Sequence, residues 1–174
     1  MKLIEFKIRR FKNLLTGILL DCGTKWSLIR YNAVDYVLDG YIFISKRYIL
    51  YENEIGEGTI QHQILSLKSR TDYFHFYENT NILDDNNLLF SILKKEKELV
   101  AICLHGEDII YVGRIKEVNL KSFALNTYDT ELRQSGVMNL EFSKVRYIQI
   151  RTDYLNSLCL LLKQKDFSES SRQS

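Results

Sequence analysis

The sequence has few of the features that mark secreted, membrane or metal-binding proteins. Its 174 residues include no proline and three cysteines, Cys22, Cys103 and Cys159. This odd number at wide spacing indicates neither a disulfide framework nor a zinc site, so we expect buried free thiols in a reducing compartment. No apolar run reaches the roughly 20 residues that a membrane-spanning helix needs, so no membrane partner is expected. Charges interrupt the apolar residues at the start, which argues against a signal peptide and favours a cytoplasmic location by elimination.

An excess of charge of one sign is also missing. The chain has 24 basic and 22 acidic side chains and a net charge of +2, which does not by itself imply a nucleic-acid partner. The hydrophobic fraction of 45% and the charged fraction of 26% are ordinary for a soluble globular protein. The 11 tyrosines and 9 phenylalanines, together with many β-branched residues, favour strands.

Catalytic and metal-binding patterns are absent as well. The three histidines have no metal-ligand spacing, and they are His62, His75 and His105. His105 can share a strand face with Cys103, but a closed zinc site usually needs four ligands. Asp35 and Asp39 form a candidate carboxylate pair, although aspartate before glycine is a common turn residue. No phosphate-cradling or nucleophile motif occurs. We therefore predict no enzyme activity, no cofactor and no metal, and a hydrolase using Asp35 or Asp39 is the least supported alternative.

A repeat with a period of ninety-six residues runs through the chain. Its anchors are matching pairs, namely Gly17 and Gly113, Lys25 and Lys121, and Gly40 and Gly136. A final block, 44–49 against 142–148, matches with a drift of two or three positions, as small loop insertions would cause. Such self-similarity predicts an internal duplication.

The hydrophobic pattern predicts mostly strands. Alternating or continuous apolar segments bounded by turns indicate strands at residues 4–8, 14–20, 26–31, 34–38, 41–44, 48–51, 100–104, 109–118, 122–128, 138–142 and 145–150. Asp39-Gly40 is a hairpin signal. Helical spacing indicates helices at 60–67, at 88–93 after the capping residues Asp84 and Asp85, and from 153 onward. The aromatic segment 71–77 is predicted to be a strand or an extended linker. The fold class is therefore mainly β with a few short helices.

The second half carries a motif that resembles the first motif of the Sm-like family. It runs from Gly113 through Ile115, Val118 and Leu120 to Leu125, with Asn119 where the family prefers aspartate. The stretch 35–41, Asp-Tyr-Val-Leu-Asp-Gly-Tyr, is similar to an uncharacterised bacterial family of tandem small-barrel proteins. The resemblance implies two tandem five-stranded Sm-like (SH3-like) barrels, the second preceded by a helix. The Arg-Gly pair of the second Sm motif, which helps to hold RNA bases, is absent because the segment 145–148 contains no glycine.

These patterns divide the chain and set the functional expectations. We expect a first barrel at 1–78, a linker at 79–87, a second barrel with leading and trailing helices at 88–165, and a frayed tail at 166–174. The favoured function is a non-enzymatic binding or assembly module for an unknown protein partner, with self-association left open. The alternative is an RNA- or single-stranded-DNA-binding protein. Its weak candidate residues are the basic side chains Lys7, Arg9, Arg10, Lys12, Arg114, Lys116 and Lys121.

Overall fold

The computed structural model describes residues 1–69, 81–107 and 109–170, the last five of these by their backbone alone. Strands dominate the described chain, as predicted. The first-half elements are β1 (Lys2–Ile8), β2 (Leu15–Cys22), β3 (Trp26–Val34), β4 (Val37–Ser45), a 3₁₀ turn η1 (Lys46–Tyr48), β5 (Ile49–Glu54) and α1 (Ile60–Ser69). The second-half elements are α2 (Asn86–Lys95), β6 (Leu99–Cys103), β7 (Ile110–Val118), β8 (Ser122–Tyr128), β9 (Gln134–Glu141), η2 (Phe142–Lys144), β10 (Tyr147–Ile150) and α3 (Asp153–Ser170). The predicted segment 71–77 lies outside the described residues.

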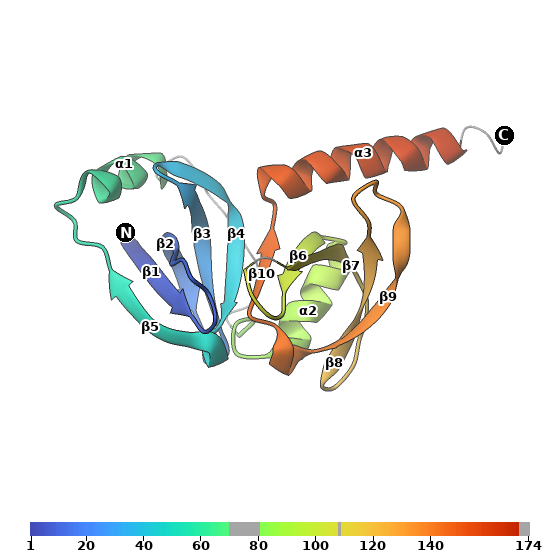
Figure 1. Ribbon diagram of the computed structural model, residues 1–174, viewed down its shortest axis with the longest axis horizontal. Helices are drawn as coiled ribbons and strands as arrows, with labels where there is room; N and C mark the ends of the chain where they lie inside the picture. The colour runs from blue at the N-terminus through green and yellow to red at the C-terminus, as the bar shows by residue number, and fades with distance from the viewer. Residues whose placement is uncertain (70–80, 108, 171–174) are drawn as a thin grey trace.

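All ten strands belong to one open antiparallel sheet. Its order is β5-β1-β2-β3-β4-β10-β6-β7-β8-β9, so β4 and β10 join the two halves in the middle (Figure 1). The mainly β class is confirmed. The finer expectation of two closed small barrels stays a prediction, since the strands form a single continuous sheet.

Each half uses the same strand order and the same registers. Gly17 pairs with Tyr31 in the first half, and Gly113 pairs with Thr127 in the second, ninety-six residues further on. The β1–β2, β3–β4 and β1–β5 pairings recur at the same separation in β6–β7, β8–β9 and β6–β10. Even the register shift in β2 after Leu19 recurs in β7 after Ile115. The period seen in the sequence is therefore a period of backbone pairing.

Two details of the sequence prediction are wrong. The drift in the last repeated block does not occur, because Ser45 ends β4 and Glu141 ends β9 at the unchanged separation. The hairpin between β3 and β4 turns at Asp35 and Tyr36, not at Asp39-Gly40, which lies inside β4. The side-chain amide of Asn32 donates to the Asp35 and Val37 carbonyls at 3.0 and 2.9 Å, which stabilises this earlier turn.

The helices that follow each set of strands occupy corresponding places. Leu65 of α1 packs with Leu3 of β1, while Leu155 of α3 packs with Leu99 of β6, the counterpart of Leu3. Both helices lie toward the same end of the sheet in Figure 1. Helix α3 continues to Ser170, past the point where the sequence prediction ended the second unit. Helix α2 precedes β6, as predicted, and no described helix precedes β1.

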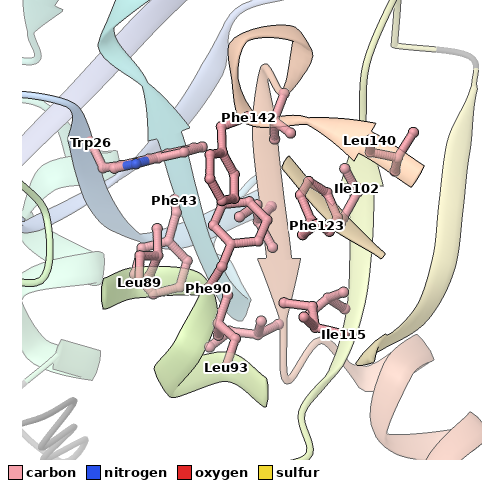
Figure 2. Packing of buried hydrophobic residues seen from close by; sticks show 14 of the residues in the cluster. Trp26, Phe43, Leu89, Phe90, Leu93, Ile102, Ile115, Phe123, Leu140 and Phe142 are labelled. Atoms are coloured by element: carbon pink, nitrogen blue, oxygen red, sulfur yellow. The ribbon is translucent and has the colours of Figure 1, made fainter. Parts of the chain in front are cut away.

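The largest core cluster is shared between the halves. Phe90 of α2 lies 6.1 Å from Trp26 of β3, 4.4 Å from Phe123 of β8 and 4.8 Å from Phe142, measured between ring centroids. Figure 2 shows Phe90 pointing from α2 into the space between these rings. Strand alternation sends Phe43 to this cluster and its neighbours Ile42 and Ile44 to a second one. Strand β4 is therefore buried on both faces, because each half covers one of them.

The described part of the predicted linker is packed rather than solvated. Ile82 and Leu83 are buried, and the Leu83 carbonyl accepts hydrogen bonds from the Lys25 and Trp26 amides. The Asp84 carboxylate accepts from the Thr24 amide. This segment holds the start of α2 against the β2–β3 turn, while the division into separate units stays a prediction.

Candidate functional site

The junction of the halves brings their corresponding loops together. At the joint, Ile44 pairs with Tyr147 and Phe43 with Ile148, so β4 and β10 run side by side. The 3₁₀ turns η1 and η2 follow β4 and β9, and the Tyr48 hydroxyl of η1 donates to the Ser143 carbonyl of η2 at 2.6 Å. Two concave sites lie at this junction. Residues of η1 and η2, or next to them, line both sites, so each site is formed by both halves.

The larger site, which we call the basic groove, has a volume of about 700 Å³. The residues lining it are Thr24, Lys25, Ser45, Lys46, Arg47, Asn86, Leu120, Lys121, Glu141, Phe142 and Ser143. Lys25 and Lys121 are counterparts at the β2–β3 and β7–β8 turns. The groove therefore has repeated geometry with four cations and one carboxylate in its lining.

The cations of the basic groove differ in their partners. Lys25 lies 3.8 Å from the Asp85 carboxylate, which offsets part of its charge. Lys46, Arg47 and Lys121 form no ion pair among the residues that the structure describes. The one lining carboxylate, Glu141, is bonded to Lys144 and Ser143, and these contacts lower the pKa of its carboxyl group. These three cations can meet an anionic ligand, although Asp84 attracts Lys46 at longer range.

The smaller site, which we call the arginine pocket, has a volume of about 290 Å³. The residues lining it are Arg9, Arg10, Tyr48, Leu104, His105, Lys144 and Arg146. They come from the β1–β2 and β6–β7 turns and from the segments that follow β4 and β9. None of the described residues in this lining carries a carboxylate.

The structure distributes the seven basic residues named from the sequence over several places. Arg9 and Arg10 line the arginine pocket, and Lys121 lines the basic groove. The other four line neither site. The Lys7 ammonium donates to the Lys12 carbonyl at 2.8 Å, and so supports the β1–β2 turn.

The remaining three of these residues have distinct surroundings. The Lys12 amide donates to the Glu107 carboxylate at 3.0 Å, which ties this turn to the second half. Lys116 is exposed on β7. Arg114 is half-buried on the same strand, and its buried Nε has no hydrogen-bond partner among the described residues.

Several residues of the two sites were not named from the sequence. Lys25 was found only as an anchor of the repeat, although its counterpart Lys121 was a candidate. Lys46 and Arg47 gave no signal, because their counterparts at the constant period, Phe142 and Ser143, are not basic. Arg146 carried no signal, because one arginine among apolar strand residues is an ordinary pattern.

The other candidate residues do not converge on a catalytic arrangement. Asp39 accepts a hydrogen bond from the Asp153 amide at 2.6 Å and so caps α3, whereas Asp35 occupies the β3–β4 turn. Burial raises the pKa of the Cys103 thiol to about 11, which makes it a poor nucleophile near neutral pH. Within the described ranges, no three metal-ligating side chains gather at one point. No helix there is both long and apolar enough to cross a bilayer.

Comparison of the chain with protein-family models, with curated proteins and with solved structures finds no match. The function must therefore be argued from the two sites and from the edges of the sheet.

Proposed function

We propose that this protein is a non-enzymatic binding protein whose basic groove holds a single-stranded nucleic acid. The observation that carries the proposal is the convergence of Lys46, Arg47 and Lys121, without ion pairs among the described residues, in one groove of about 700 Å³. Single-strand binders combine such basic grooves with tolerance of sequence, because the phosphates supply most of the affinity.

The repeated geometry supports the same function. Lys25 and Lys121, from the corresponding β2–β3 and β7–β8 turns, both line the groove, so one strand would meet a lysine from each half. The common registers at a constant separation also support an internal duplication of an Sm-like unit, and we propose this as the origin of the chain. RNA binding would then occur without the Arg-Gly pair that the family uses.

The test is fluorescence anisotropy of a labelled mixed-sequence RNA and of single-stranded DNA. We expect binding at about 50 mM salt that weakens as salt rises, since each phosphate contact contributes about 0.7 to the slope of log affinity against log salt. The triple variant Lys46→Gln, Arg47→Gln, Lys121→Gln should lower both affinity and slope. The matched control, Lys94→Gln, Lys97→Gln, Lys116→Gln, removes three exposed lysines outside the groove and should behave like the wild type. Absence of binding at about 50 mM salt would contradict the proposal.

A second candidate function, assembly of copies through strand pairing, has its own observation. The outer strands of the sheet are β5 and β9, and they are the counterparts of β10 and β4, which pair at the joint. The same pairing between copies would place Tyr51 of one copy opposite Leu140 of the next. Exposed strand edges favour such pairing, whereas Glu52 and Glu54 on β5 weaken it relative to the apolar joint.

Analytical ultracentrifugation over a range of concentrations tests this candidate. Assembly predicts concentration-dependent mass that Val137→Glu abolishes, because residue 137 would face Glu54 of the next copy and like charges repel. Val34→Glu is the control, since Val34 is exposed at the end of β3 and away from both outer strands. A mass that equals one chain at every concentration would rule the candidate out.

A further inference from the structure

The arginine pocket contains one arginine that is almost wholly buried. Arg146 is 4% exposed, and its guanidinium carbon lies 4.4 Å from the centre of the Tyr48 ring. Its Nε donates to the Leu104 carbonyl at 3.0 Å and one terminal nitrogen donates to the Arg9 carbonyl at 2.5 Å. The side chain is thus held in one orientation, from both halves of the protein.

The charge of Arg146 has no matching carboxylate among the residues that the structure describes. It forms no ion pair with any described residue, and its second terminal nitrogen donates to none of them. Burial is the largest cause that lowers the pKa of this guanidinium, and Arg9 and Arg10 add to the effect. A buried charge is ordinarily paired, because isolation from water is costly. Among the described residues, the pocket therefore contains an excess of positive charge that a ligand or solvent can balance.

A second arginine in the pocket adopts a backbone conformation that favours glycine. Arg10 has a φ of 69°, in the left-handed region where a side chain is strained. Its counterpart ninety-six residues on, Gly106, does not adopt this conformation, so the left-handed backbone at Arg10 is particular to the first half. Strain that persists beside a concave site points to a binding role for the side chain.

We propose that the arginine pocket binds a phosphate group, with Arg146, Arg10 and Arg9 as its donors. The second terminal nitrogen of Arg146 and the planar guanidinium groups of Arg9 and Arg10 can donate to the oxygens of a phosphate, and no carboxylate among the described lining residues competes for them. Lys144 supplies less, because its ammonium is 3.1 Å from the Glu141 carboxylate. The phosphate belongs either to the end of a nucleic-acid strand or to a free small molecule, and both sources present the same chemistry.

Thermal unfolding with inorganic phosphate tests the pocket directly, because a ligand that binds the folded state raises Tm. We expect a saturable rise with phosphate that sodium chloride at matched ionic strength does not reproduce. Arg10→Gly should keep or raise the Tm of the free protein, since it relieves the backbone, yet weaken phosphate binding about tenfold. Arg9→Gln should weaken it similarly.

The control is Lys97→Gly. It removes the backbone strain of an exposed lysine that has a φ of 53° and lies outside the pocket, and it should leave phosphate binding unchanged. An equal rise with chloride, no rise with phosphate, or full phosphate binding by Arg10→Gly would each overturn the proposal.

Matched oligonucleotides with a 5′-phosphate or a 5′-hydroxyl then separate the two sources. A preference for the phosphorylated strand that Arg10→Gly removes identifies a strand end. A response to inorganic phosphate alone identifies a free phosphate, and it leaves the pocket proposal standing even if strand binding in the basic groove fails.

Discussion

The two halves of this protein share a backbone plan and differ in what covers it. Both use five strands in the same order and register, followed by a helix that packs on the first strand of the set. Helix α2 precedes only the second set among the described elements, and it fills the shared core with Leu89, Phe90 and Leu93. The first half contributes Trp26 and Phe43 to that core.

Residues that the shared strand pairing requires can be distinguished from residues that join the two halves. Positions that serve pairing recur in both halves, as Gly17 and Gly113 do. Several positions at the junction do not recur, because each half presents a different surface to the other. Arg146 has Leu50 as its counterpart, and Trp26 has Ser122. Variants can therefore test the two kinds of position separately.

The largest effect is expected from Phe90→Ala, which removes the ring that links Trp26 to the second half. Loss of a buried phenylalanine lowers the free energy of unfolding by about 3–5 kcal/mol. Trp26 is the only tryptophan, so its fluorescence reports on the junction while circular dichroism reports on the whole sheet. Both signals should change in one transition at lower denaturant. Ser91→Ala, on the exposed side of α2, is the control. Separate transitions for the two signals would show that the halves fold independently.

Substitution of the two pairing glycines compares the halves directly. A Cβ at Gly113 would lie 2.2 Å from the Asn126 carbonyl oxygen, and one at Gly17 would lie 2.6 Å from that of Arg30. We expect Gly113→Ala to lower the free energy of unfolding by about 2–3 kcal/mol and Gly17→Ala by about 1–2 kcal/mol, because backbone must move. Gly58→Ala, where nothing lies within 4 Å, should be nearly neutral. Urea unfolding measures all three, and neutrality of both pairing variants would contradict the repeated geometry.

Two helix caps differ in origin: one is a local contact, and the other is a contact between the halves. Asp85 caps α2 from its own chain segment by accepting from the Leu88 amide at 3.0 Å, whereas Asp39 of β4 caps α3 from the other half. Replacement of either by alanine should cost about 1 kcal/mol in urea unfolding. Only Asp39→Ala should also loosen the junction, seen as faster amide hydrogen exchange in α3. Equal exchange in both variants would show that the contact between halves adds no constraint.

Sequence patterns predicted the local elements better than their arrangement. Alternation at Met138, Leu140 and their neighbours identified β9, and the glycine spacing identified the repeat. The pairing of β4 with β10 left no such mark, because edges of strands far apart in the chain meet through shape and burial rather than through a local period. The sequence pattern predicts a turn at Asp39-Gly40, because the residue that Asp39 contacts in α3 lies 114 residues away and leaves no local signal.

Residues of the candidate sites were likewise predicted only where the local sequence gave a signal. Lys121 and Arg9 were named because basic residues gather near them in the chain. Arg146 acquires its significance only from Tyr48 and from the carbonyls of Leu104 and Arg9, which surround it in the folded state.

The smallest expected effect concerns Asp84, whose contact with Thr24 joins the segment before α2 to the β2–β3 turn. Its carboxylate accepts from the Thr24 amide, and this hydrogen bond is the main cause that lowers the pKa of Asp84 from its usual value of 3.8. A lowered folded-state pKa means that the ionised group stabilises the fold above pH 3.8 and that the contribution is lost as pH falls through the folded pKa.

Asp84→Asn should therefore have a lower Tm than the wild type near neutral pH, and the difference should close as the solution is acidified below the usual pKa. Thermal unfolding by circular dichroism across this range measures the difference. Glu57→Gln, in the exposed loop before α1, controls for the change in net charge. A difference that stays constant at every pH would show that the Thr24 contact depends on the shape of the side chain and not on its charge.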